Sequence, residues 1–263
     1  MNNNLPSWLQ GYINIFDNEH VHHAFIISGS KGIGKSLLIE TLAEKILNNK
    51  ISLENNPDFH NLKILDEKKL IGINQIHELR DKLYESSFLG KNKVAVINEI
   101  EKISIDGLNA ILKILEEPPK NTYFLLSTNF LNQIPLTIQS RCFDLRISSP
   151  EIKQSLEWLS DYQTKDALKA LEITNNLPIK ARHFLDNKLL DARDNFVKDV
   201  SGIIKEGKDI TTISEKWIKD NNTLNLKLEW MSQILSDSIK FHADKSIESL
   251  TSDTDAISKH LSG

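Results

Sequence analysis

GSKGIGKS at residues 29–36 matches the phosphate-loop pattern G-x-x-x-x-G-K-[ST] at every defined position. An apolar run, Ala24–Ile27, precedes the motif, and a stretch compatible with a helix follows from Lys35 to about Leu47. The pattern is meaningful when it lies between a strand and a helix, so this context predicts a nucleotide-binding α/β domain. The alternative is a glycine-rich turn that binds nothing. We favour the phosphate loop because the whole pattern and its context agree.

The residues of this loop have separate tasks in phosphate binding. Gly29, Gly32 and Gly34 allow backbone N–H groups to curl around phosphate oxygens, and the N-terminus of the following helix adds partial positive charge. Lys35 is expected to reach the β- and γ-phosphates, and Ser36 is expected to bind Mg²⁺. The loop therefore predicts ATP with Mg²⁺ as its ligand. It does not by itself predict hydrolysis.

Composition places the chain among ordinary soluble proteins. Of its 263 residues, 40% are hydrophobic and 26% are charged, and no apolar run approaches the ~20 residues of a membrane helix. The N-terminus lacks the basic and apolar regions of a signal peptide, so we expect a cytoplasmic protein without membrane contact. A net charge of −4 disfavours a free-standing nucleic-acid-binding protein, but not contact with DNA inside an assembly. The single cysteine, Cys142, excludes an intramolecular disulfide and a multi-cysteine zinc site.

The first half of the chain alternates strand-like and helix-like segments. Residues 93–97 form a β-branched run typical of a buried strand, and residues 73–84 carry apolar side chains at helical spacing. Strands that alternate with helices predict a parallel sheet covered on both faces. We expect strands at 24–27, 62–65, 93–97, 122–127 and 142–145, and helices at 35–47, 73–84 and around 108–115.

The pattern changes near Pro150, after which the sequence contains no convincing strand. Trp158, Trp217 and Trp230 are expected to anchor a core or an interface, because no basic residues interleave with them as in a base-stacking surface. The tail after Lys245 is rich in Ser, Asp and Thr and is expected to fray. We expect helices at 150–160, 165–174, 179–190, 191–205, 212–220 and 223–243, and domains at 1–147, 148–190 and 191–263.

Further polar residues follow the strands on either side of the loop. A phosphate-loop enzyme needs an acidic residue that holds the magnesium shell and a base that orients water. At the end of strand 93–97 these positions hold Asn98 and Glu99. Because Asn98 is uncharged, impaired hydrolysis is favoured over a harmless strand-end cap or a weak amide ligand. Asn129, which follows strand 122–127, could hydrogen-bond to the γ-phosphate, although Asn in this place is typical of turns.

Two later segments make the chain recognisable. Residues 109–119 read NAILKILEEPP, and residues 137–142 read TIQSRC. Together they resemble the Ala-Leu-Leu-Lys-Thr-Leu-Glu-Glu-Pro-Pro and Ser-Arg-Cys signatures of clamp-loader subunits of the AAA+ family. The resemblance covers nearly all of residues 20–185 and takes in His23-Ala24, Pro57-Asp58, Gly72-Ile73 and Leu177–Ala181.

The resemblance implies a P-loop AAA+ parallel-sheet domain followed by a small helical lid and a C-terminal helical collar for oligomerisation. It also implies partners: gamma/tau and delta subunits in a hetero-pentamer that opens the sliding clamp and closes it around primed DNA. In such assemblies the Ser-Arg-Cys arginine, here Arg141, projects into the ATP site of the neighbouring subunit. A planar, permanently charged guanidinium suits that task. Without the resemblance, a helix-end cap beside Ser140 would be the favoured interpretation of Arg141.

Two departures from the family pattern narrow the function. Many relatives carry a four-cysteine zinc module after the phosphate-loop helix, but residues 48–56 contain no cysteine, so we expect no zinc. Motor subunits carry a lid arginine that touches the γ-phosphate. At its position stands Ile179, with Lys180 and Arg182 close by. Together with Asn98, Ile179 argues against a hydrolysing motor.

Three classes of function follow from these observations. The first is a stator subunit of the bacterial DNA polymerase III clamp loader, which supplies Arg141 in trans and is not an active ATPase by itself. The alternative is a gamma/tau-like motor ATPase, favoured by the intact phosphate loop and by Glu99. A stand-alone phosphate-loop protein is the third, and it does not explain why both signatures occur. Asn98, Ile179 and the short C-terminal region favour the stator.

Overall fold

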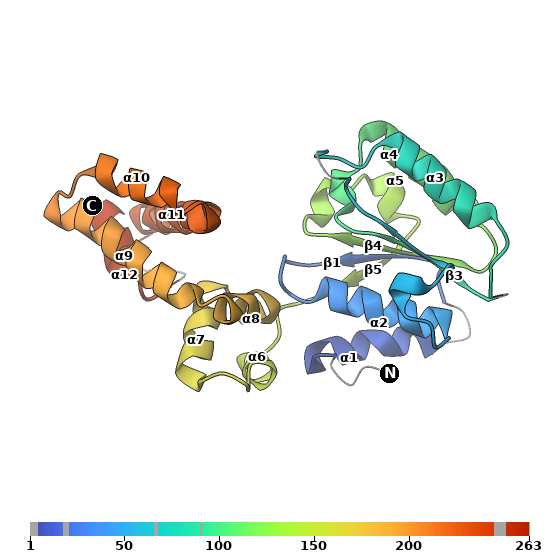
Figure 1. Cartoon of the computed structure of the whole chain (residues 1–263), viewed down its shortest axis with the longest axis horizontal. Helices are drawn as coiled ribbons and strands as arrows, with labels where there is room; N and C mark the ends of the chain where they lie inside the picture. Colours follow the sequence, from blue (N-terminus) through green and yellow to red (C-terminus); the bar gives the residue numbers. More distant parts are fainter. Residues whose placement is uncertain (1–4, 18–20, 66–67, 90, 245–250, 263) are drawn as a thin grey trace. The chain divides into compact units, whose positions relative to one another are not determined.

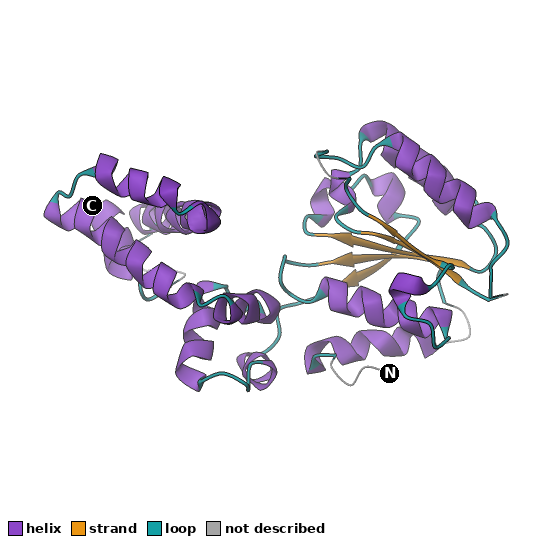
Figure 2. Cartoon of the chain, viewed as in Figure 1, coloured by secondary structure: helices purple, strands orange, loops and turns teal. Residues whose placement is uncertain are grey.

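The computed structural model describes residues 5–17, 21–65, 68–89, 91–244 and 251–262. The chain forms two compact units, Met1–Gln154 and Ser155–Gly263 (Figure 1). In the described residues, the first unit contains the strands and the second is helical (Figure 2). The expected division into domains at 1–147, 148–190 and 191–263 stays a prediction.

The first unit is built on a parallel sheet with helices on both faces, as the sequence predicts. In spatial order its five strands are β2 (Phe59–Leu62), β3 (Lys93–Ile97), β4 (Thr122–Thr128), β1 (Ala24–Ser28) and β5 (Phe143–Arg146). Figure 1 shows α1 (Ser7–Ile13) and α2 (Lys35–Leu47) on one face, and α3 (Ile73–Tyr84), α4 (Ile105–Glu116) and α5 (Leu136–Gln139) on the other. Because the strands are parallel, their carboxyl ends lie at one edge of the sheet.

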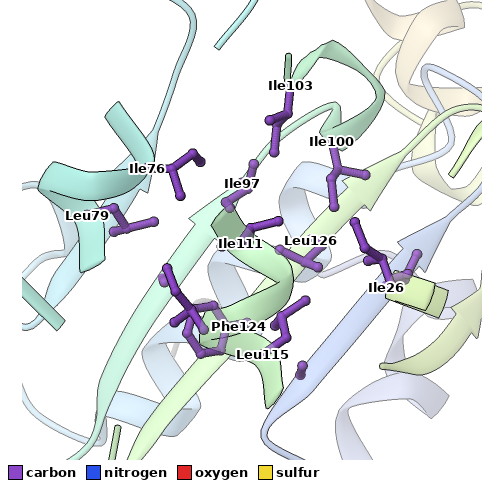
Figure 3. Packing of buried hydrophobic residues seen from close by; sticks show 14 of the residues in the cluster. Ile26, Ile76, Leu79, Ile97, Ile100, Ile103, Ile111, Leu115, Phe124 and Leu126 are labelled. Carbon is purple, nitrogen blue, oxygen red and sulfur yellow. The ribbon is translucent and has the colours of Figure 1, made fainter. Parts of the chain in front are cut away.

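Alternating residues of the strands form a hydrophobic core between the sheet and the face covered by α3, α4 and α5. Ile97, Phe124 and Leu126 point toward α3 and α4, where they meet Ile76 and Ile111 (Figure 3). All five side chains are fully buried. Burial of a side chain of this size contributes about 1.5–3 kcal/mol, so this cluster fixes the strands that carry the loop and the residues after it.

Seven helices follow the sheet in the described residues, and one hydrophobic cluster joins most of them. In this cluster the ring centre of Phe196 lies 5.3 Å from that of Trp217 and 5.3 Å from that of Trp230, and the partly buried Trp158 packs against the cluster. The expectation that these tryptophans anchor a core is therefore confirmed. The helices are α6 (Ile152–Trp158), α7 (Thr164–Ile173), α8 (Pro178–Asp186), α9 (Leu189–Glu206), α10 (Ile210–Lys219), α11 (Asn221–Ala243) and α12 (Asp255–Ser262).

Two predicted segments differ from the structure. The strand expected at 62–65 lies at Phe59–Leu62 instead. It pairs with β3 from Phe59 opposite Val94 to Leu62 opposite Ile97. β2 is an edge strand and half-exposed, so its apolar signal is weak. The helix expected at 179–190 ends at Asp186, because the left-handed conformation of Lys188 (φ 53°) interrupts it before α9 begins.

The expectation of a frayed tail is wrong for residues 251–262; residues 245–250 lie outside the described part of the chain. Helix α12 packs against α11, and Ile257 joins the second unit's hydrophobic cluster. Before it, Asp253 accepts two hydrogen bonds from the fully buried guanidinium of Arg193, each 2.8 Å long. A buried ion pair, invisible in the tail's polar composition, holds this segment in place.

Candidate functional site

The phosphate loop, residues 29–36, joins β1 to α2 at the carboxyl edge of the sheet. Gly29, Gly32 and Gly34 have φ values of 155°, 92° and 113°, a region that favours glycine. A Cβ on Gly29 would lie 3.0 Å from the carbonyl oxygen of Ile147, so this position is also closed to side chains. The backbone has the curled path that lets N–H groups surround a phosphate.

Lys35 begins α2 and is only 8% exposed. Its Nζ donates to the carbonyl oxygens of Gly29 (2.7 Å) and Ser30 (3.1 Å) and to Oδ1 of Asn129 (2.8 Å). Burial lowers the pKa of Lys35 to about 8, against the opposing effect of the nearby Glu101 and Glu99 carboxylates. The ammonium is therefore held directly by neutral oxygens, which an anionic phosphate can replace.

Asn129, directly after β4, links Lys35 to two carboxylates. Its Nδ2 donates to Oε1 of Glu99 and to Oε1 of Glu101, each at 3.1 Å, and its backbone N–H donates to Glu101 at 3.0 Å. The structure thus brings together Lys35, Glu99 and Asn129, three residues that the sequence singles out. Their roles toward a nucleotide stay predictions.

Glu101 is the site residue that sequence reasoning missed. It lies in the 3-10 helix Ile100–Lys102, which follows β3. One of its oxygens, Oε2, is buried and has no hydrogen-bond partner in the described part of the chain. The sequence signal was a second acidic residue two positions after Glu99, outside the phosphate-loop pattern. Glu101 adds a negative charge beside Lys35 at the cost of an unpaired oxygen.

Asn98 and Glu99 are both engaged with protein groups. Glu99 has a φ of 54° and forms an ion pair with Lys102 (Oε2–Nζ 2.6 Å), and the hydrogen bond from Lys102 lowers the pKa of Glu99. Asn98 accepts a hydrogen bond from Ser127 Oγ and donates one to Asn61 Oδ1, each at 3.3 Å. The Asn98 amide therefore connects β3 to both neighbouring strands.

A phosphate fits the loop better than a metal ion fits the residues beside it. The loop supplies the curled backbone and the buried Lys35, whereas Ser36 is exposed on the first turn of α2. Among the described residues, no group of three or more His, Cys, Asp or Glu side chains is placed to hold a metal ion. The phosphates of a nucleotide and water would therefore supply most oxygens around Mg²⁺.

Arg141 lies two residues after the end of α5, outside the hydrogen-bond network of Lys35 in the described contacts. Its Nη1 donates to the carbonyl oxygen of Thr137 (2.7 Å), which caps α5, and its Nη2 pairs with Oε1 of Glu116 (2.6 Å). The side chains of Arg141 and Glu116 are 34% and 43% exposed. This ion pair joins the two signature segments, because Glu116 belongs to the first and Arg141 to the second.

Neither the cysteine nor the interval after α2 offers a zinc-binding thiolate. Cys142 packs against the core of the first unit, and burial raises its pKa to about 12, so the thiol stays protonated. Residues 48–56 contain the 3-10 helix Leu53–Asn55. The expectation of a protein without zinc stays a prediction.

The basic residues near the predicted lid position contact their own unit. Ile179 is half-buried on α8. Lys180 pairs with Glu229 at 3.2 Å. The Arg182 guanidinium pairs with Asp161 and lies 5.1 Å from the centre of the Trp158 ring. Arg182 is therefore stabilised by an ion pair and a cation–π contact within the helical unit.

Comparison with known proteins agrees with the signatures. A family model described as DNA polymerase III, delta subunit, matches residues 5–151. The delta-prime subunit of DNA polymerase III from Buchnera aphidicola subsp. Schizaphis graminum is 31% identical over 247 residues, which cover 87% of this chain and 74% of that protein. The chain belongs to the DNA polymerase III delta-prime family. The clamp-loader resemblance inferred from residues 109–119 and 137–142 is therefore confirmed.

Two other comparisons place the delta-prime family member among related folds. The DNA polymerase III gamma subunit of the same Buchnera is 31% identical over 197 residues, but the match covers only 60% of this chain. A gamma-subunit-related protein from Thermotoga maritima has a similar fold, with a TM-score of 0.51, 17% identity, and coverage of 97% of this chain and 92% of that one. The match to a delta-prime subunit thus extends further than the match to a gamma subunit. None of the described helices is long and apolar enough to cross a membrane.

Proposed function

We propose that this chain is the stator subunit of a clamp loader, and that it supplies Arg141 to the ATP site of a neighbouring subunit. The proposed assembly is a hetero-pentamer with gamma/tau and delta subunits, acting in the cytoplasm to open the sliding clamp and close it around primed DNA. Membership of the delta-prime family supports this function. The observation that carries the role of Arg141 is its half-exposed guanidinium, held by one exposed carboxylate.

The contacts of Arg141 suit a group that changes partners. An ion pair as exposed as that with Glu116 contributes about 0–1 kcal/mol, so exchanging Glu116 for a phosphate on another subunit costs little. The hydrogen bond from Nη1 to the Thr137 carbonyl oxygen keeps the guanidinium at the end of α5 meanwhile. A planar guanidinium can then donate two parallel hydrogen bonds to phosphate oxygens and offset the charge that develops on them.

The chain's own phosphate loop is proposed to bind ATP with Mg²⁺ and to hydrolyse it poorly. Mg²⁺ supplies charge neutralisation to the phosphates when bound. Lys35 and the loop N–H groups would hold the phosphates, while the Ser36 hydroxyl would bind the metal. The missing charge at Asn98 and the ion pair of Glu99 with Lys102 both weaken the groups that would activate water.

The helices after the sheet are proposed to form a lid, residues 148–190, and a collar, residues 191–263, that joins the ring. Leu224 and Met231 are partly buried and pack against the hydrophobic cluster of the second unit. Leu228, Leu235 and Ile239 on the same long helix, α11, are 56%, 50% and 70% exposed. An apolar row of this kind supports contact with another subunit, because exposed hydrophobic patches mark interaction sites.

Reconstitution of the clamp loader with Arg141→Ala tests the proposal. We expect ATP hydrolysis at the affected site and clamp loading to fall roughly tenfold or more, since an arginine in trans supplies a large share of phosphoryl-transfer catalysis. Arg80→Ala is the matched control, because Arg80 also forms an exposed ion pair in the first unit, with Asp81. Unchanged hydrolysis and loading with Arg141→Ala would refute the role of Arg141.

The alternative is a gamma/tau-like motor, which the partial match to a gamma subunit and the intact phosphate loop favour. Turnover of ATP by the purified chain with Mg²⁺ separates the two functions. We expect negligible turnover. Brisk turnover that Lys35→Ala abolishes would establish the motor instead.

A further inference from the structure

Helix α1 hydrogen-bonds to the backbone on both sides of the phosphate loop. The indole Nε1 of Trp8 donates to the carbonyl oxygen of Ile33 at 3.0 Å. One turn later, the hydroxyl of Tyr12 donates to the carbonyl oxygen of Arg146 at 2.8 Å. Between them, Leu9 is fully buried and fixes the helix against the unit. No part of the phosphate-loop pattern points to these residues.

The carbonyl that Trp8 holds belongs to a peptide with glycine neighbours. Ile33 stands between Gly32 (φ 92°) and Gly34 (φ 113°), and glycine allows wide rotation about its backbone bonds. If the peptide between Ile33 and Gly34 turned over, its carbonyl oxygen would face the phosphate and its N–H would face away. The indole hydrogen bond holds this oxygen on the outside of the loop. It therefore selects the orientation in which the Gly34 N–H can bind an anion.

The carbonyl that Tyr12 holds lies beside the start of the loop. Arg146 pairs with Ser28, the last residue of β1, and the N–H of Ile147 donates to the carbonyl oxygen of Ser28 at 2.8 Å. Gly29 then packs so closely against Ile147 that a Cβ would not fit without movement. Through Trp8 and Tyr12, α1 is attached to the middle of the loop and to the strand against which the loop begins.

We propose that Trp8 is a positioning residue for phosphate binding in this chain, with Tyr12 as a weaker second support. Trp8 acts through the peptide of Ile33 and does not touch the nucleotide. The inference rests on the proposed binding of ATP to the loop. It adds that α1 determines how tightly polyphosphate is held, so any partner that displaces α1 would loosen nucleotide in this subunit.

The test compares the full-length chain with Trp8→Phe, Tyr12→Phe and Trp217→Phe by isothermal titration with ATP and with inorganic tripolyphosphate. Trp8→Phe keeps an aromatic ring and removes the N–H donor. Trp217→Phe is the matched control, because Trp217 also donates an indole hydrogen bond, to Asp199 at 2.9 Å in the second unit. Thermal unfolding of each variant measures stability separately.

We expect Trp8→Phe to weaken the binding of both probes by roughly threefold to tenfold, the effect of one lost hydrogen bond. Tyr12→Phe should weaken binding less, and Trp217→Phe should bind as the wild type does. An equal loss for ATP and tripolyphosphate assigns the effect to the phosphates rather than to the base. If the wild type binds ATP and Trp8→Phe binds it equally well, the positioning role of Trp8 is refuted while the proposed nucleotide site stands. If the wild type binds neither probe, the proposed nucleotide site falls together with it.

Discussion

Lys35 in the first unit and Arg193 in the second are both buried cations, yet they are held in opposite ways. Lys35 contacts two backbone carbonyls and one amide, and among the described contacts it is linked by hydrogen bonds to the Glu99 and Glu101 carboxylates through Asn129. Arg193 contacts the Asp253 carboxylate directly at two points and lies 5.3 Å from the centre of the Trp230 ring.

The difference separates a binding cation from a structural one. A cation surrounded by neutral oxygens keeps most of its attraction for an incoming anion, and in the proposed function a phosphate takes the place of Asn129 at Lys35. The charge of Arg193 is already offset by the largely buried Asp253 carboxylate, so it has little attraction left for another anion, and removal of either partner leaves an uncompensated charge. The partners of a buried cation therefore indicate its task better than its burial does.

The largest effect is expected on the stability of the second unit, when Arg193, the structural cation, is replaced. Arg193→Met should lower the free energy of unfolding of the second unit by about 2–4 kcal/mol, because Asp253 loses its partner in a largely buried setting. ATP binding by the first unit should not change. Urea unfolding followed by tryptophan fluorescence measures the loss, since Trp158, Trp217 and Trp230 belong to this unit.

A double variant, Arg193→Met with Asp253→Leu, is the control for Arg193→Met. It should recover much of the lost stability, because an apolar pair can replace a buried ion pair. If Arg193→Met unfolds at the wild-type urea concentration, the two cations do not differ in the way described.

A smaller effect is expected from pH, and it acts on Lys35. Burial lowers the pKa of Lys35 from 10.5 to about 8, and phosphate binds the protonated form. The affinity for ATP should therefore fall about tenfold between pH 7 and pH 9, as the free protein loses this proton. Isothermal titration across this range measures the change.

Lys35→Met is the control for the pH profile, since it should bind ATP weakly with no such dependence. The stability of the protein responds with the opposite sign. Because the folded-state pKa lies below the unfolded value, the free energy of unfolding should rise as the pH goes from about 8 toward 10.5. A wild-type affinity that is constant between pH 7 and pH 9 would contradict the described environment of Lys35.

The smallest effect is expected when the Lys35 site is made more like the Arg193 site by an added carboxylate. Asn98→Asp should make ATP binding roughly twofold to fivefold more dependent on Mg²⁺, because a carboxylate is a better magnesium ligand than an amide. The gain is limited, since the donor to Asn61 is lost. The measured quantity is the ratio of ATP affinities with Mg²⁺ and with a chelator.

Asn92→Asp is the matched control for Asn98→Asp, because Asn92 precedes the same strand, β3, at its other end. Its ratio of affinities should equal that of the wild type. A wild-type ratio already above about tenfold would show that Asn98 does not limit magnesium binding.

The sequence predicted what depends on neighbours along the chain. The loop, α2 and β3 follow from continuous patterns, and Lys35, Glu99 and Asn129 follow from the rule that strand ends of a parallel sheet share an edge. These residues do come together in the structure.

The parts that could not be predicted depend on contacts between distant segments. Trp8 meets Ile33 across 25 positions, and Arg193 meets Asp253 across 60. Neither pair has a spacing rule. Glu101 was hidden for another reason: it belongs to a 3-10 turn whose direction after β3 is set by packing of Ile100 and by the positive φ of Glu99.

The pairing of Arg193 with Asp253 limits which substitutions can accumulate at these two positions during evolution. Loss of either residue alone passes through a destabilised protein, whereas joint replacement by apolar side chains does not. We therefore expect positions 193 and 253 to co-vary among relatives. Relatives should hold both charges or neither, although one position lies in a helix of the bundle and the other in a polar tail that resembles dispensable sequence.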